Sequence, residues 1–127
     1  MNVVDSSGWL EYLSDSSTAE FFAEAIENTA ELIVPSITIY EVFKRVLQQR
    51  GEEAALQATA MMLQGRIIEL DQSIAMSAAA ISCESKTAMA DSIILATARA
   101  HHAILWTQDI DLKGFDNIRY IAKAKQP

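Results

Sequence analysis

Four carboxylates stand where the sequence could use them for chemistry on a charged substrate: Asp5, Glu41, Asp91 and Asp109. Asp5 follows a short run of β-branched residues, and Asp109 comes just after a second apolar run, so each is placed beyond a predicted buried strand. Because parallel strands bring their carboxyl ends to one edge of a sheet, where open α/β folds keep their chemistry, these two acids are expected at the same rim.

The other two acids lie on predicted helices. Ile94, Leu95 and Ala98 stand three, four and seven residues after Asp91, and these positions share a helix face with it. Asp91 therefore heads the buried stripe of its own helix. Glu41 borders the apolar stripe of an earlier helix, so its carboxylate is expected to point toward the rim of the sheet.

Taken singly, each of the four acids also has a purely structural interpretation. Asp5 and Asp109 are typical of caps and turns. Glu41 is spaced for an ion pair with Arg45 one helical turn later. Asp91 could cap its helix, unless the threonine four residues earlier does so and leaves Asp91 in the first turn, where the helix dipole favours a negative charge.

Taken together, the four acids indicate a metal site. A cluster of carboxylates repels itself and loses hydration unless a cation sits among them. Hard divalent ions such as Mg²⁺ take oxygen ligands, keep several waters and complete their shell with substrate phosphate. Such an ion can activate water and stabilise the leaving oxygen of a phosphodiester, and it would let an acidic protein hold a polyanion.

Composition limits the class of protein and its partners. The chain has 127 residues, 50% of them apolar and 21% charged, which predicts a single domain, 1–127, with its own core. Its one cysteine, Cys83, excludes an internal disulfide, fits a reducing cytoplasm and is interpreted as a small core residue. No apolar run is long enough for a membrane span, and no secretory leader is visible. The net charge of −7 argues against general electrostatic binding to nucleic acid, so a polyanion would need local cations.

Strands and helices are expected to alternate along the whole chain, which predicts an α/β fold with a parallel sheet covered on both faces. The expected strands are three or four residues ending at Asp5, then 32–34, 67–70, 104–107 and 118–121. The expected helices are 8–13, the region of 21–26, a helix from an N-cap at Ser36 to Gly51, then 52–63, 72–85 and 89–100.

Four short stretches, in this order, carry a resemblance to a known family: Val3-Val4-Asp5-Ser6-Ser7, Val34-Pro35-Ser36 through Tyr40-Glu41-Val42, Ala90-Asp91-Ser92 through Ala96-Thr97-Ala98, and Trp106-Thr107-Gln108-Asp109. The pattern resembles a PIN domain, and with the small size it is similar to a VapC-type toxin. The resemblance implies a five-stranded parallel sheet in a three-layer α/β/α sandwich. It also implies a Mg²⁺- or Mn²⁺-dependent endoribonuclease in the cytoplasm, which hydrolyses RNA with metal-activated water. A cognate antitoxin and a homodimer are the partners implied.

Carried over residue by residue, the resemblance makes Asp5 and Asp91 the main metal ligands. Glu41 and Asp109 become the remaining acids, which orient metal-bound water or a second ion. Asp111 leaves open which of two neighbouring acids is the fourth, and Asp109 is preferred because it is nearer the strand end. Two hydroxyl positions, Ser6 and Thr107, match residues that support such a site.

The sequence also leaves a choice of substrate contacts and of function. The basic residues that could form an RNA footprint are Lys44, Arg45, Arg50, Lys113, Lys123 and Lys125, although solvated surface is the more ordinary interpretation of each. One alternative function is a catalytically silent PIN-like module that binds a protein. The other is a receiver-like phosphorylation domain, with Asp71 after the third strand as its acceptor.

Overall fold

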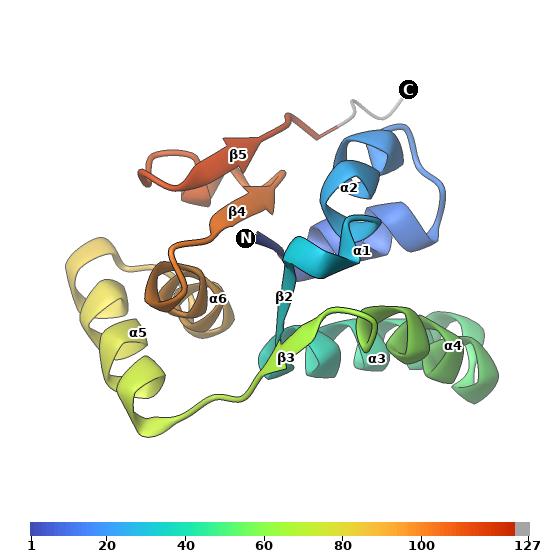
Figure 1. The fold of residues 1–127 in the computed structure, drawn as a ribbon, viewed down its shortest axis with the longest axis horizontal. Coiled ribbons are helices and arrows are strands. Elements are labelled where there is room, and N and C mark those ends of the chain that lie inside the picture. The colour runs from blue at the N-terminus through green and yellow to red at the C-terminus, as the bar shows by residue number, and fades with distance from the viewer. Residues whose placement is uncertain (124–127) are drawn as a thin grey trace.

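Five parallel strands form one sheet that is covered by helices on both faces. The computed structural model describes residues 1–123. The strands are β1 (Asn2–Val4), β2 (Leu32–Pro35), β3 (Arg66–Ile68), β4 (Ile104–Thr107) and β5 (Ile118–Tyr120). The helices are α1 (Ser6–Leu13), α2 (Ala19–Ile26), α3 (Ser36–Arg50), α4 (Glu52–Met62), α5 (Gln72–Ser85) and α6 (Met89–Ala100), with short 3₁₀ turns η1 (Thr29–Glu31) and η2 (Ile110–Leu112). In Figure 1, α5 and α6 lie on one side of the sheet and α1 to α4 on the other, which confirms the predicted three-layer sandwich.

The order of the strands in the sheet is β3-β2-β1-β4-β5, with every neighbouring pair parallel. The chain builds outward from β1 through β2 to β3, and then returns to add β4 on the other side of β1. The strand order therefore reverses between β1 and β4. In open α/β sheets this reversal leaves a crevice beyond the carboxyl ends of the two strands, where ligands bind.

The core is divided into two parts by the sheet. Neighbouring residues of a strand point to opposite faces, so Val3 packs under α5 and α6 while Val4 packs under the helices on the other side. The same alternation separates Leu105 from Trp106 in β4. Because both faces are covered, each central strand reads as a continuous apolar run and not as an alternating one.

The starts of α1 and α3 differ from the sequence prediction, whereas α6 begins as predicted. α1 begins at Ser6, two residues earlier than predicted, because the side chain of Asp5 caps it. Ser36 is the first residue of α3 and not its N-cap, and Pro35 holds the cap position without a side-chain hydrogen bond. α6 begins at Met89 as predicted, but Ala88 holds its cap position without a side-chain bond, so neither Thr87 nor Asp91 is the cap and Asp91 lies in the first turn.

Cys83 is exposed, so its interpretation as a core residue is wrong. The buried face of α5 is formed by Ile74, Ala78 and Ile81. Cys83 follows Ile81 by two residues, which places it about 200° around the helix and toward solvent. No helix within the described residues 1–123 is long and apolar enough to cross a bilayer.

Candidate active site at the carboxyl edge of the sheet

A hollow of about 280 Å³ opens beyond the carboxyl ends of β1 and β4, at the reversal of strand order. Its lining contains all four predicted acids: Asp5 after β1, Glu41 from α3, Asp91 from α6 and Asp109 after β4. The other lining residues are Ser6, Ser7, Leu10 and Arg45. We call this the acid hollow. Asp111 is exposed and does not line it.

Asp5 is held by three hydrogen-bond donors. Its Oδ1 accepts from the backbone N–H of Gly8 at 2.9 Å and from the Ser7 hydroxyl at 3.0 Å, and its Oδ2 accepts from the Thr107 hydroxyl. Burial raises the pKa of Asp5 above its usual range, and the charge of Asp109 raises it further, while the three donors pull it back down. The structural interpretation of Asp5 as a helix cap is confirmed, and the same carboxylate lines the acid hollow.

Two hydroxyls orient the acids of the hollow. Thr107 donates to Asp5 while its oxygen accepts from the backbone N–H of Asp109 at 2.9 Å, so it joins the ends of β1 and β4. Ser6 donates to Oε1 of Glu41. The ion pair between Glu41 and its neighbour one turn later, Arg45, does not form within residues 1–123, so that interpretation of Glu41 is wrong.

Asp91 has the most perturbed environment of the four acids. Its pKa is raised to about 7, first by burial and then by the charges of Asp109, Asp5 and Glu41. A hydrogen bond with Asp109 raises the pKa further, and no donor among residues 1–123 offsets these effects. Asp91 therefore stays protonated to nearly neutral pH while no cation is near, because burial and the charges of the other three acids both disfavour its ionised form.

A divalent cation fits the chemistry of this hollow. All the charged groups that line it besides Arg45 are carboxylates, which are the donors that Mg²⁺ and Mn²⁺ prefer. Their mutual repulsion, visible in the pKa of Asp91, is what a cation would relieve. Within residues 1–123, no three acidic, histidine or cysteine side chains already stand in a ligating group. Mg²⁺ needs no such cage, since one or two carboxylates, several waters and substrate phosphate complete its shell.

Sequence reasoning did not find a polar network beside the acid hollow. The buried Gln108, next to Asp109 in the chain, donates to Glu11 at 3.3 Å, and the buried Thr18 hydroxyl donates to the same carboxylate at 3.2 Å. Hydrogen bonding, first from Ser16 and then from these two residues, lowers the pKa of Glu11. These residues are far apart in sequence and of common polar types, so no spacing signals the network.

The fold is matched by known proteins. The PIN domain family model matches residues 3–118, and the chain belongs to this family. A chain of a toxin–antitoxin complex from Klebsiella pneumoniae is similar in structure, with a TM-score of 0.79, 24% identity, and coverage of 94% of this chain and 96% of that one.

Two further solved structures share the fold at lower identity. VapC20 of Mycobacterium tuberculosis, described as a toxin that cleaves the sarcin–ricin loop, has a TM-score of 0.73 and 16% identity, with 94% of this chain and 99% of that chain covered. A chain of VapBC2 from Rickettsia felis, bound to a DNA fragment from its promoter, has a TM-score of 0.74 and 16% identity, with 95% and 97% covered. A search among curated protein sequences finds no match. The chain thus has the fold of VapC-type toxins.

Proposed function

We propose that this PIN domain protein is a Mg²⁺- or Mn²⁺-dependent endoribonuclease and the toxin of a toxin–antitoxin pair. The observation that carries the proposal is the meeting of four acids from four distant segments in one hollow at the reversal of strand order. The similarity to VapC20, a toxin that cleaves RNA, supports the substrate class. Because the chain is acidic overall, a cation in the hollow would also offset the repulsion of a phosphodiester.

In this proposal each acid has a defined role. Asp5 and Asp91 are the main metal ligands, and Glu41 and Asp109 orient the attacking water or a second ion. When bound, the cation would supply Lewis-acid stabilisation of the phosphodiester and lower the pKa of a water molecule. The donors to Asp5 fix the orientation of its carboxylate, and Asp91 would release its proton if a cation bound beside it.

The partners follow from the same similarities. Similar chains were solved in toxin–antitoxin complexes, which supports a cognate antitoxin that holds this chain inactive. A homodimer and a cytoplasmic location complete the proposal, both on the resemblance to VapC-type toxins.

Of the two alternative functions, the receiver-like domain is wrong. Receivers have the strand order 2-1-3-4-5, whereas the order here is β3-β2-β1-β4-β5. Its supposed acceptor, Asp71, caps α5 by accepting from the backbone N–H of Ile74 at 2.8 Å, and it does not line the acid hollow. The other alternative, a catalytically silent PIN-like module that binds a protein, is tested by the following experiment.

Incubation with total cellular RNA tests the proposal. With Mg²⁺ or Mn²⁺ the protein is expected to produce new 5′ ends that can be mapped, and none with EDTA. Asp91→Asn is expected to reduce cleavage about 100-fold or more, since even residues that only orient ligands contribute 10- to 100-fold. Asp111→Asn is the matched control, because this exposed acid lies outside the acid hollow, and it should cleave like the wild type. Equal cleavage by both variants would refute the site, and no cleavage by the wild type would indicate the silent module.

A further inference from the structure

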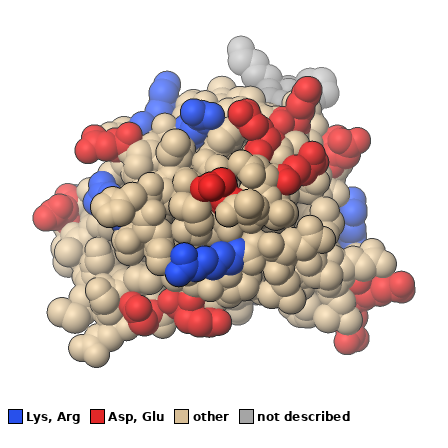
Figure 2. All heavy atoms as spheres, viewed as in Figure 1, with Lys and Arg blue, Asp and Glu red and all other residues tan. Residues whose placement is uncertain are grey.

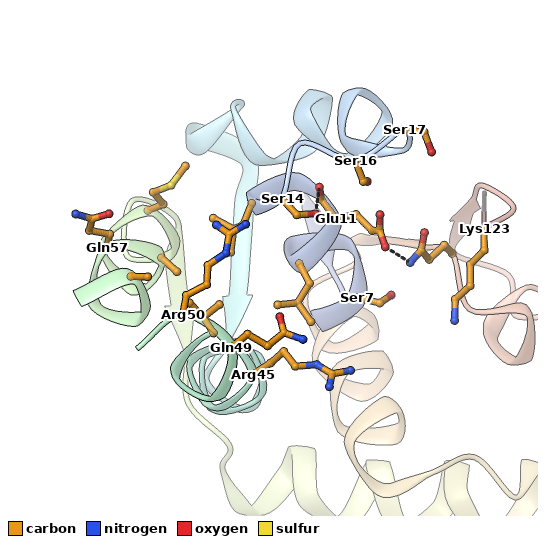
Figure 3. Close-up of a pocket in the computed structure, with 17 residues that line it drawn as sticks. Ser7, Glu11, Ser14, Ser16, Ser17, Arg45, Gln49, Arg50, Gln57 and Lys123 are labelled. Carbon is orange, nitrogen blue, oxygen red and sulfur yellow. Dashed lines mark hydrogen bonds between the residues drawn. The ribbon is translucent and has the colours of Figure 1, made fainter. Parts of the chain in front are cut away.

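A larger groove of about 790 Å³ adjoins the acid hollow, and the two share Ser7, Leu10 and Arg45 in their linings. The groove runs over α1, α3 and α4, as Figure 3 shows. Its lining combines apolar side chains with serine, glutamine and basic ones. We call it the basic groove. A strand that enters the acid hollow from this side must pass along it, because the two hollows are continuous at Arg45.

Two arginines of α3 mark the course of the basic groove. In Figure 3, Arg45 extends from α3 toward the side of α1 that carries Ser7, whereas Arg50 rises between α1 and α4. They are five residues apart, or about 7.5 Å along the helix axis. Neither forms an ion pair within residues 1–123, where the only ion pair joins the amino terminus and Glu31. Both guanidinium groups are therefore available to a ligand.

The other candidate cations of the predicted footprint are placed differently. Lys44 lies over the ring of Tyr40 at 5.7 Å and Lys113 over that of Tyr120 at 5.0 Å, and neither lines the groove. Lys125 lies outside the described residues. On the face shown in Figure 2, basic side chains are scattered singly among acidic ones, without a continuous basic patch. Although the chain is acidic overall, the two unpaired arginines thus make this groove locally positive.

The third cation of the groove, Lys123, shares the lining with an acid of the protein itself. Its charge contributes to the lowered pKa of Glu11, after hydrogen bonds from Ser16, Gln108 and Thr18. Glu11 is the one carboxylate in the lining of the groove among the described residues. Because Glu11 and Lys123 line the groove together, their charges offset one another, and the two arginines are left as the cations for a ligand.

We propose that the basic groove holds single-stranded RNA on one side of the cleaved bond, with Arg45 binding the phosphate nearest the acid hollow and Arg50 a phosphate further along. Guanidinium groups match phosphate geometry with two parallel hydrogen bonds. None of the lining residues among the described part of the chain is aromatic, so bases are not stacked there and the groove reads the backbone. α1 and α4 stand on either side of the groove (Figure 3), which favours a single strand over a wider duplex. The inference rests on the proposed ribonuclease function and adds where its substrate runs.

The test is a binding measurement that does not depend on cleavage. All variants carry Asp91→Asn, and the probe is a fluorescein-labelled single-stranded RNA of mixed sequence, followed by anisotropy in Mg²⁺ at several salt concentrations. Arg45→Gln with Arg50→Gln should weaken binding roughly 25-fold at 0.1 M salt and reduce the slope of log K against log salt by about 1.4, because each contact to a single-stranded phosphate contributes about 0.7. Duplex RNA of the same sequence should bind more weakly than the single strand.

The matched control is Lys44→Gln with Lys113→Gln, which removes the same charge outside the groove and should leave the affinity and the slope unchanged. Arg45→Lys with Arg50→Lys should keep the slope, which separates loss of charge from misfolding. Equal weakening by the two glutamine pairs would overturn the groove, because net charge would then explain the effect. An unchanged slope of log K against log salt for Arg45→Gln with Arg50→Gln would also overturn the proposal. The groove would then be a candidate binding site for a protein segment instead of RNA.

Cleavage separates a failure of the groove from a failure of the proposed function. In the background with Asp91 intact, Arg45→Gln with Arg50→Gln should raise KM more than it lowers kcat, since the acids are untouched. A wild type that cleaves RNA, together with an arginine pair whose KM equals that of the lysine pair, would overturn the groove alone. A wild type that cleaves no RNA with either metal would overturn the proposed function, whatever the binding result.

Discussion

The end of β1 and the first turn of α6 each bring a carboxylate into the acid hollow, but the two are stabilised in opposite ways. Asp5 receives three hydrogen bonds, from Ser7, Gly8 and Thr107, and caps α1. Asp91 has no such donors among residues 1–123, and burial, followed by the charges of three other acids, raises its pKa to about 7. The comparison indicates that the carboxylate of Asp5 helps to build the fold, whereas the charged form of Asp91 opposes it.

The largest effect on this comparison should come from removing the support of Asp5. Thr107→Val leaves an oxygen of Asp5 and the backbone N–H of Asp109 without their partners. We expect cleavage to fall about 10- to 100-fold, as for other residues that orient metal ligands, and the free energy of unfolding to fall by about 1–3 kcal/mol. Activity assays and urea unfolding measure both. Thr107→Ser keeps the hydroxyl and should restore both, and full activity in the valine variant would contradict the supporting role.

A smaller effect is expected on the free energy of unfolding in EDTA, which should differ between variants of Asp5 and of Asp91. Asp5→Ala removes a helix cap, which should lower the free energy of unfolding by about 0.5–2 kcal/mol. Asp91→Ala removes a carboxyl whose charged form is disfavoured by burial and by three other acids, so it should leave the stability of the metal-free protein equal or higher. Urea unfolding at neutral pH compares the two variants. If both were destabilised alike, Asp91 would be a structural residue in the same sense as Asp5.

The smallest effect is a pH dependence of metal-free stability. The pKa of Asp91 is about 7 in the folded protein and 3.8 in the reference state, so between these values the folded chain binds the extra proton. Stability must then fall as the pH rises through this range, and stay level above it. The melting temperature in EDTA should therefore decline from pH 5 to pH 8, and decline less in Asp91→Asn. Identical profiles would show that Asp91 titrates normally.

Much of the framework could be predicted from the sequence because its signals are local. Apolar runs beside Asp5 and Asp109 predicted the strands, and the stripe that follows Asp91 predicted which face of α6 is buried. Parallel strands then bring the two strand-end acids to one edge. The order of the strands has no local signal, because it depends on which side of β1 the returning β4 finds free.

The side-chain contacts were less predictable because neighbours in sequence compete with distant ones. Glu41 has Arg45 one turn away, yet it accepts from Ser6 of another helix. The polar network around Gln108 joins residues separated by most of the chain. The basic groove arises only after α1, α3 and α4 have packed together, so spacing along the chain could not separate Arg45 and Arg50 from the other cations.

The pairing of β1 with β4 has a consequence for protein synthesis. The first strand of the chain lies between β2 and β4, and β4 begins only at Ile104. A chain still on the ribosome, with its last quarter unmade, leaves one edge of β1 bare and lacks both Thr107 and Asp109. Such a nascent chain cannot assemble the acid hollow, so under the proposed function it would not cleave RNA until β4 has been made and has paired with β1.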